Sequence, residues 1–97
     1  MFVHIIKSNE EEYVYPFVSI TREKDTLVFM PKDFKGSTED LLKEASIKFN
    51  TVEDAKRVFE LALYFMDSDS VVFDIDLNNY FKHMKYVRAK LDAMKKG

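Results

Sequence analysis

The sequence predicts a single α+β domain, 1–97, in which a small antiparallel sheet packs against two or three helices. The region up to residue 31 holds three short runs rich in β-branched and aromatic residues, separated by polar connections. Two later segments, 51–66 and 76–95, repeat apolar residues three and four positions apart, as amphipathic helices do. The 97 residues, 46% of them hydrophobic, suit one domain with one core.

The three N-terminal runs are expected to form a meander of consecutive antiparallel strands. They cover Phe2–Lys7, Tyr13–Thr21 and Thr26–Met30. Pro16 has no N–H to donate, so the second strand is predicted to lie at an edge of the sheet or to be broken at this residue. Pro31 ends the third strand.

Two patterns compete in the segment that follows. A helix beginning at Ser37 or Thr38 is favoured, with acidic residues in its first turn. Its apolar positions would be Leu41, Leu42, Ala45 and Phe49. Residues 45–49 also alternate between apolar and polar, as a strand does, so the sequence leaves open whether they are helix or strand. As a strand, they would form a right-handed βαβ crossover with the next helix and residues 71–75.

The segment from Thr51 to Met66 is predicted to be the central helix of the core. Thr51 is a suitable N-cap, and acidic residues follow in the first turn, where the helix dipole favours them. Its second half is apolar on nearly every side, which is typical of a buried helix. We therefore expect Phe59, Ala62 and Phe65 to be buried.

A polar turn, an interior strand and a last helix are expected after Met66. The strand is predicted from Val71, Val72, Phe73 and Ile75. Asp76 is expected to cap the helix, which runs to about Lys95. One face of the helix is an apolar seam of Leu77, Tyr80, Met84, Val87, Leu91 and Met94. Either the protein's own core or a symmetric dimer would bury this seam.

The opposite face of the last helix is the candidate partner-binding site. It carries Lys82, Lys85, Tyr86, Ala89 and Ala93. A tyrosine and two alanines among lysines favour a contact surface over a purely solvated face. The helix is also basic: residues 77–97 carry a net charge of +5, whereas residues 1–76 carry −7.

The aspartate-rich strand end is the motif most suggestive of catalysis. The run from Val71 through Asp74 to Asp76 resembles the first motif of haloacid-dehalogenase-type phosphatases, which implies a nucleophile and a general acid near Mg²⁺. That family continues with Gly-Thr, whereas this chain has Leu77 and Asn78, and only 21 residues follow Asp76. We therefore expect both aspartates to be structural.

No other pattern points to an active site, a cofactor or a metal. His4 and His83 are far apart in sequence, and neither has a second His or Cys at ligand spacing. There is no cysteine, and neither glycine belongs to a phosphate-binding loop. Since no leader or long apolar run is present, we expect a cytoplasmic protein without a membrane segment.

The function expected from these observations is non-catalytic recognition of another protein. Lysine outnumbers arginine twelve to three, a usage common in AT-rich genomes including those of many phages, so a viral accessory protein that inhibits or redirects a host factor is the specific hypothesis. The alternative is a nucleic-acid-binding protein that uses the basic last helix. A sequence pI of about 5.7 argues against this alternative. A homodimer is a further expectation.

Overall fold

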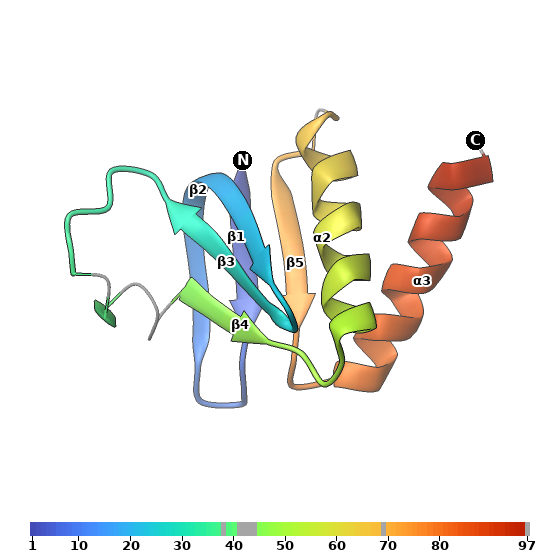
Figure 1. Cartoon of the computed structure of the whole chain (residues 1–97), viewed down its shortest axis with the longest axis horizontal. Coiled ribbons are helices and arrows are strands. Elements are labelled where there is room, and N and C mark those ends of the chain that lie inside the picture. The colour runs from blue at the N-terminus through green and yellow to red at the C-terminus, as the bar shows by residue number, and fades with distance from the viewer. Residues whose placement is uncertain (38, 41–44, 69, 97) are drawn as a thin grey trace.

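A mixed sheet and two helices make up the fold (Figure 1). The computed structural model describes residues 1–37, 39–40, 45–68 and 70–96. Within these ranges the strands are β1 (Phe2–Ile6), β2 (Glu12–Glu23), β3 (Thr26–Pro31), β4 (Ser46–Lys48) and β5 (Val72–Asp76). The helices are α2 (Val52–Met66) and α3 (Tyr80–Lys96), and the order of strands in the sheet is β4-β3-β2-β1-β5.

The predicted meander of β1, β2 and β3 is confirmed, but the prediction of a wholly antiparallel sheet is wrong. β5 pairs in parallel with β1, with Val3 opposite Phe73 and Ile5 opposite Ile75. A parallel neighbour requires a long connection rather than a hairpin, and α2 lies within that connection.

The prediction for β2 is corrected by its position between β3 and β1. Its first half pairs with β1 up to Pro16, and its second half pairs with β3 from Phe17 onward, with an irregularity between Phe17 and Ser19. Pro16 therefore lies where the strand changes partners. Its missing N–H is tolerated there, while its carbonyl accepts a hydrogen bond from the Lys32 N–H at 2.9 Å.

The favoured helix interpretation of residues 45–49 is wrong for the strand residues Ser46–Lys48. These residues form β4, which pairs antiparallel with β3 and places Ile47 opposite Leu27. Alternation prevails because Ile47 faces the core while Lys48 is exposed. The hydroxyl of Ser37 accepts from the Asp40 N–H at 3.2 Å, as a helix cap does, whereas Thr38, Leu41 and Leu42 lie outside the described residues.

The βαβ crossover considered for this region is not formed. β4 and β5 lie at opposite edges of the sheet, and the succession of pairings makes them antiparallel to each other. α2 therefore connects two strands that are not neighbours.

A single hydrophobic core lies between the helices and one face of the sheet. The sheet contributes Val3, Ile5, Leu27, Phe29, Ile47, Phe73 and Ile75, and the helices contribute Ala55, Val58, Leu61, Ala62, Met84, Val87 and Leu91. Ala62 is buried as predicted, but Phe59 and Phe65 are only partly buried at the margin of this core. The inward face of α2 is centred on Val58 and Leu61, and the two phenylalanines flank it.

The apolar seam of α3 packs on the protein's own core. Met84, Val87 and Leu91 are buried, while Tyr80 and Met94 are partly buried against them. A symmetric dimer through this seam is therefore not available. Asp76 ends β5 rather than forming part of the helix, and its Oδ1 accepts from the Asn79 N–H at 3.1 Å, which closes the turn before α3.

Candidate partner-binding surfaces

The five residues predicted as the partner-binding site lie on one exposed face of α3. Lys82, Lys85, Tyr86, Ala89 and Ala93 are all exposed. They share a face because their spacing places them opposite the buried Met84, Val87 and Leu91. We call these five residues the outer α3 surface.

An aromatic residue that sequence reasoning left out borders this surface. Phe81 is 79% exposed, more than any other large hydrophobic side chain described, and Tyr86 is 48% exposed. Phe81 contacts the ring of Tyr80 edge-on, with 5.7 Å between ring centroids. Such exposure of an aromatic ring is unusual for a helix whose opposite face already supplies the core. The signal in the sequence was its place outside the apolar seam.

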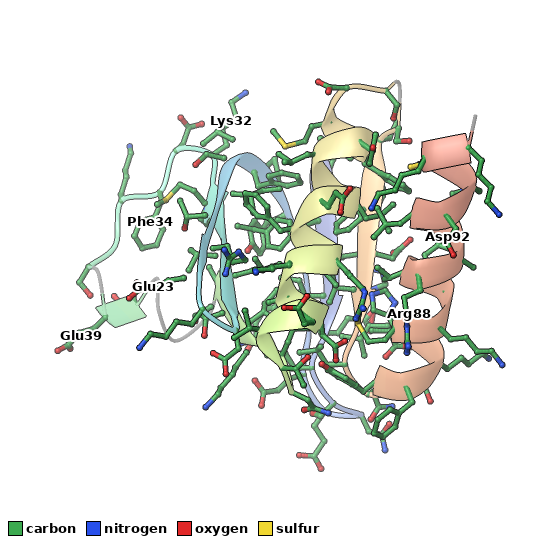
Figure 2. The ribbon with its side chains drawn as sticks, turned by 45° about the vertical axis from the view of Figure 1, so that its right-hand side comes forward. Glu23, Lys32, Phe34, Glu39, Arg88 and Asp92 are labelled. Atoms are coloured by element: carbon green, nitrogen blue, oxygen red, sulfur yellow. The ribbon has the colours of Figure 1, made fainter. Side chains whose placement is uncertain are left out.

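The positive charge of α3 is only partly neutralised within the molecule. Lys95 forms an ion pair with Glu60 of α2 at 3.1 Å, and Arg88 donates to the carbonyl of Met84 at 3.3 Å. Among the described residues, no carboxylate pairs with Lys82 or Lys85 within 4.0 Å. Figure 2 shows Arg88 and Asp92 on α3, with Glu23 and Glu39 toward the other end of the molecule.

A shallow hollow lies beside the outer α3 surface, where β5 turns into α3. Its volume is about 270 Å³, and it is lined by Asp76, Asn79, Lys82, His83 and Tyr86. His83 is only 8% exposed, and its buried Nε2 has no hydrogen-bond partner in the structure. Burial lowers the pKa of His83 below its usual 6.5, so this imidazole is neutral at physiological pH.

The two aspartates of the strand end take separate structural roles. The side-chain amide of Asn79 donates to Asp76 at 3.0 Å, and this bond is the main reason why the pKa of Asp76 lies below its usual range. Asp74 instead contacts His4. Within the described ranges, no group of three His, Cys, Asp or Glu residues is placed to hold a metal ion.

Sequence reasoning missed a cluster centred on His4. The His4 Nε2 lies 2.6 Å from Glu12 Oε2, and its Nδ1 lies 2.8 Å from Asp74 Oδ1. The bond to Glu12, followed by that to Asp74, raises the pKa of His4 above 6.5. The protonated ring can donate to both carboxylates at once and so links β2, β1 and β5. No local pattern predicts this cluster, because Asp74 is 70 residues away and meets His4 only through strand pairing.

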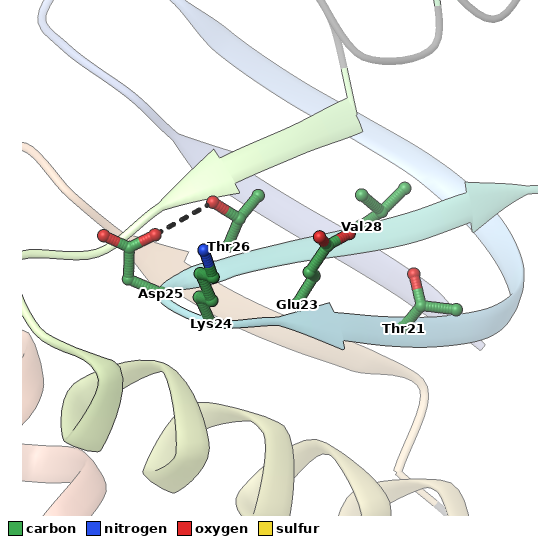
Figure 3. Close-up of a pocket in the computed structure, with 6 residues that line it drawn as sticks. All are labelled: Thr21, Glu23, Lys24, Asp25, Thr26 and Val28. Atoms are coloured by element: carbon green, nitrogen blue, oxygen red, sulfur yellow. Dashed lines mark hydrogen bonds between the residues drawn. The ribbon is translucent and has the colours of Figure 1, made fainter.

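A second hollow lies at the β2–β3 hairpin. Its volume is about 290 Å³, and Figure 3 shows Thr21, Glu23, Thr26 and Val28 along its wall, with Lys24 at the turn. Lys24 has a φ of 54°, the left-handed conformation that a tight turn requires. Because one glutamate, one lysine and an aspartate bound to its own neighbour supply the charge here, the hollow favours no single ligand class.

Comparison with known proteins provides no family for this chain. No protein-family model, no curated protein and no solved structure matches it. In the described part of the chain, none of the helices has the length and apolar content needed to cross a bilayer. Any function must therefore be argued from the surfaces themselves.

Proposed function

We propose that the protein is a non-catalytic protein-interaction module that binds its partner through the outer α3 surface. The observation that supports this most is the exposure of Phe81 and Tyr86 on a helix whose apolar seam is already buried. Aromatic side chains, Tyr in particular, contribute strongly to interface energy when a partner covers them. Ala89 and Ala93 leave room beside Tyr86 for a partner side chain.

The lysines of this surface indicate the charge of the partner. Lys82 and Lys85 flank Tyr86 and pair with no described carboxylate of the chain. An acidic partner surface would complement them and would associate faster because of the attraction. In a cell, inhibition or redirection of a host factor by a small viral accessory protein is the role we propose for such a contact.

Nucleic-acid binding is the second candidate, because the same lysines could contact phosphates and Tyr86 could stack on a base. The protein reading is favoured because the remainder of the chain, residues 1–76, carries a net charge of −7, which repels a polyanion. The alanines of the outer α3 surface also add nothing to phosphate binding.

Substitutions on α3 distinguish the two candidates once a partner has been isolated with and without nuclease treatment. For a protein contact, Tyr86→Ala should weaken binding by at least about tenfold, and Ala89→Glu should abolish it, since both change the centre of the surface. Lys82→Gln should weaken binding only slightly, because an exposed charge at a rim contributes little. Isothermal titration calorimetry with the purified partner measures these changes.

The matched control is Tyr64→Ala on α2, which removes a tyrosine of similar exposure (39%) outside the surface and should leave the affinity unchanged. For phosphate binding the order reverses: each lysine removed weakens binding similarly, and the salt dependence shrinks by roughly one in slope per contact. Equal losses from every lysine would refute the proposed function.

A further inference from the structure

The sheet has one face that the helices do not cover. Along β1 and β5, alternate side chains such as Val3 and Phe73 enter the core, so Phe2, His4, Val72 and Asp74 point to the other side. α2 and α3 both contribute to the core on the first side. We call the side that carries Phe2 and His4 the outer face.

The pairing registers arrange the outer face in rows across three strands. Phe2 is opposite Val72 on one side and Pro16 on the other, which makes an entirely apolar row. In the next row, His4 is opposite Asp74 and Val14. Phe2 and Val72 are each 40% exposed and Val14 is 60% exposed, although residues directly opposite each other pack side by side. Adjoining exposed apolar side chains of this kind mark an interaction surface.

The charge of the outer face is negative and held in place. Glu12 and Asp74 each direct one carboxylate oxygen to His4, at 2.6 and 2.8 Å. Their other oxygens, Glu12 Oε1 and Asp74 Oδ2, accept no hydrogen bond from the described residues. Two carboxylates therefore flank one imidazole, and each keeps a free acceptor beside Val14 and Phe2. Because His4 already fixes both side chains, a partner would lose little conformational entropy in meeting them.

We propose that the outer face binds a partner segment in which apolar side chains alternate with Lys or Arg. The apolar side chains would cover Phe2, Val14 and Val72, and the cations would meet the free oxygens of Glu12 and Asp74. A second copy of the same face is a poor occupant, because a symmetric pairing brings two further carboxylates against these two. This surface is separate from the outer α3 surface and attracts the opposite charge.

Three synthetic octapeptides test the proposal with the intact 97-residue chain. The first alternates Val and Lys, the second replaces Lys with Glu, and the third replaces Val with Ser. Binding is followed by amide chemical shifts at about 0.15 M salt, where exposed charges more than about 8 Å apart are screened. The Val/Lys peptide should shift residues 2–6, 12–16 and 72–76 and leave 80–96 unchanged, while the other two peptides bind at least about tenfold more weakly.

Variants of the protein complete the test. Val14→Lys should weaken binding of the Val/Lys peptide at least about tenfold without harming the fold, because residue 14 is mostly exposed. Leu63→Lys on α2, at a similarly exposed apolar position (44%), is the matched control and should bind normally. Glu12→Gln combined with Asp74→Asn should weaken binding and reduce its salt dependence.

Several results would overturn the proposal. Equal binding of the Val/Glu peptide would remove the charge argument, and shifts confined to α3 would place the contact elsewhere. Unchanged binding by Val14→Lys would show that the apolar row is not used. If sedimentation of the protein alone showed self-association that Val14→Lys abolishes, the occupant would be a second copy. Tyr86→Ala should not affect this peptide, so the test is independent of the α3 proposal.

Discussion

The two histidines show how one residue type acquires opposite properties in one small protein. His4 lies between two carboxylates on the outer face, and His83 is buried beside the α3 hollow. The sequence marks both only as isolated histidines. Their difference depends on strand register and burial, since Glu12 and Asp74 reach His4 from two different strands. Residue-scale chemistry of this kind is not predictable before the pairing of β1 with β5 is known.

The titration midpoints of the two histidines should therefore move in opposite directions. His4 should titrate above 6.5, because Glu12 and then Asp74 favour the protonated ring, and His83 should titrate below 6.5 because burial disfavours it. The imidazole proton signals in NMR measure both midpoints. Glu12→Gln should lower the midpoint of His4 more than Asp74→Asn does, with His83 little changed in the first variant. A His4 midpoint at or below 6.5 would contradict the bridging geometry.

At the scale of elements, strongly patterned segments were predictable and ambiguous ones were not. α2 begins after Thr51 as expected, and the Thr51 hydroxyl accepts from the Asp54 N–H at 3.0 Å. The seam and the exposed face of α3 also follow from its 3.6-residue period. β4 was misassigned because its short alternation fits a helix nearly as well. The parallel placement of β5 depends on the path of the chain over the sheet, which no local pattern encodes.

Tyr80 fixes the start of α3 against the start of α2 and offers a direct test of this junction. Its hydroxyl donates to Asp54 Oδ2 at 2.6 Å and accepts from the Asn50 N–H at 2.7 Å. Burial, followed by the bond to Asp54, raises the pKa of Tyr80 to about 12, so the hydroxyl remains a donor at physiological pH. Tyr80→Phe keeps the ring but removes both bonds. It should lower the free energy of unfolding by about 1–2 kcal/mol, measured by urea denaturation.

The control for this junction is Tyr64→Phe, because Tyr64 lies on the exposed side of α2 and no hydrogen bond of its hydroxyl is seen among the described residues. Its stability should change by less than about 0.5 kcal/mol. If both variants were equally stable, the clamp between α2 and α3 would contribute nothing, and the two helices would be held together by the apolar seam alone.

At the scale of the whole molecule, two opposed surfaces differ in charge. α3 carries the basic surface at one side, and the outer face of the sheet carries carboxylates around an apolar row (Figure 1). The charge split between residues 1–76 and 77–97 was visible in the sequence. Its distribution in space was not, because the acidic outer face is assembled from strands at both ends of the chain.

The stability of the whole protein should pass through a maximum near pH 6.5, the ordinary histidine pKa. Between the lowered pKa of His83 and 6.5, the unfolded chain binds more protons than the native protein, so stability rises with pH. Between 6.5 and the raised pKa of His4, the native protein binds more protons, so the stabilisation from the His4 cluster is lost as pH rises. Asp76, with its pKa below 3.8, is ionised in both states above about pH 5 and leaves this window unchanged.

Urea denaturation at intervals from pH 5 to pH 9 measures this profile. His4→Gln should be less stable than the parent at pH 6 and should lose the decline above pH 6.5, while the rise below pH 6.5 persists because His83 is intact. A decline of the same size in His4→Gln would assign the alkaline limb to other groups. It would also mean that the imidazole between Glu12 and Asp74 does not stabilise the junction of β2, β1 and β5.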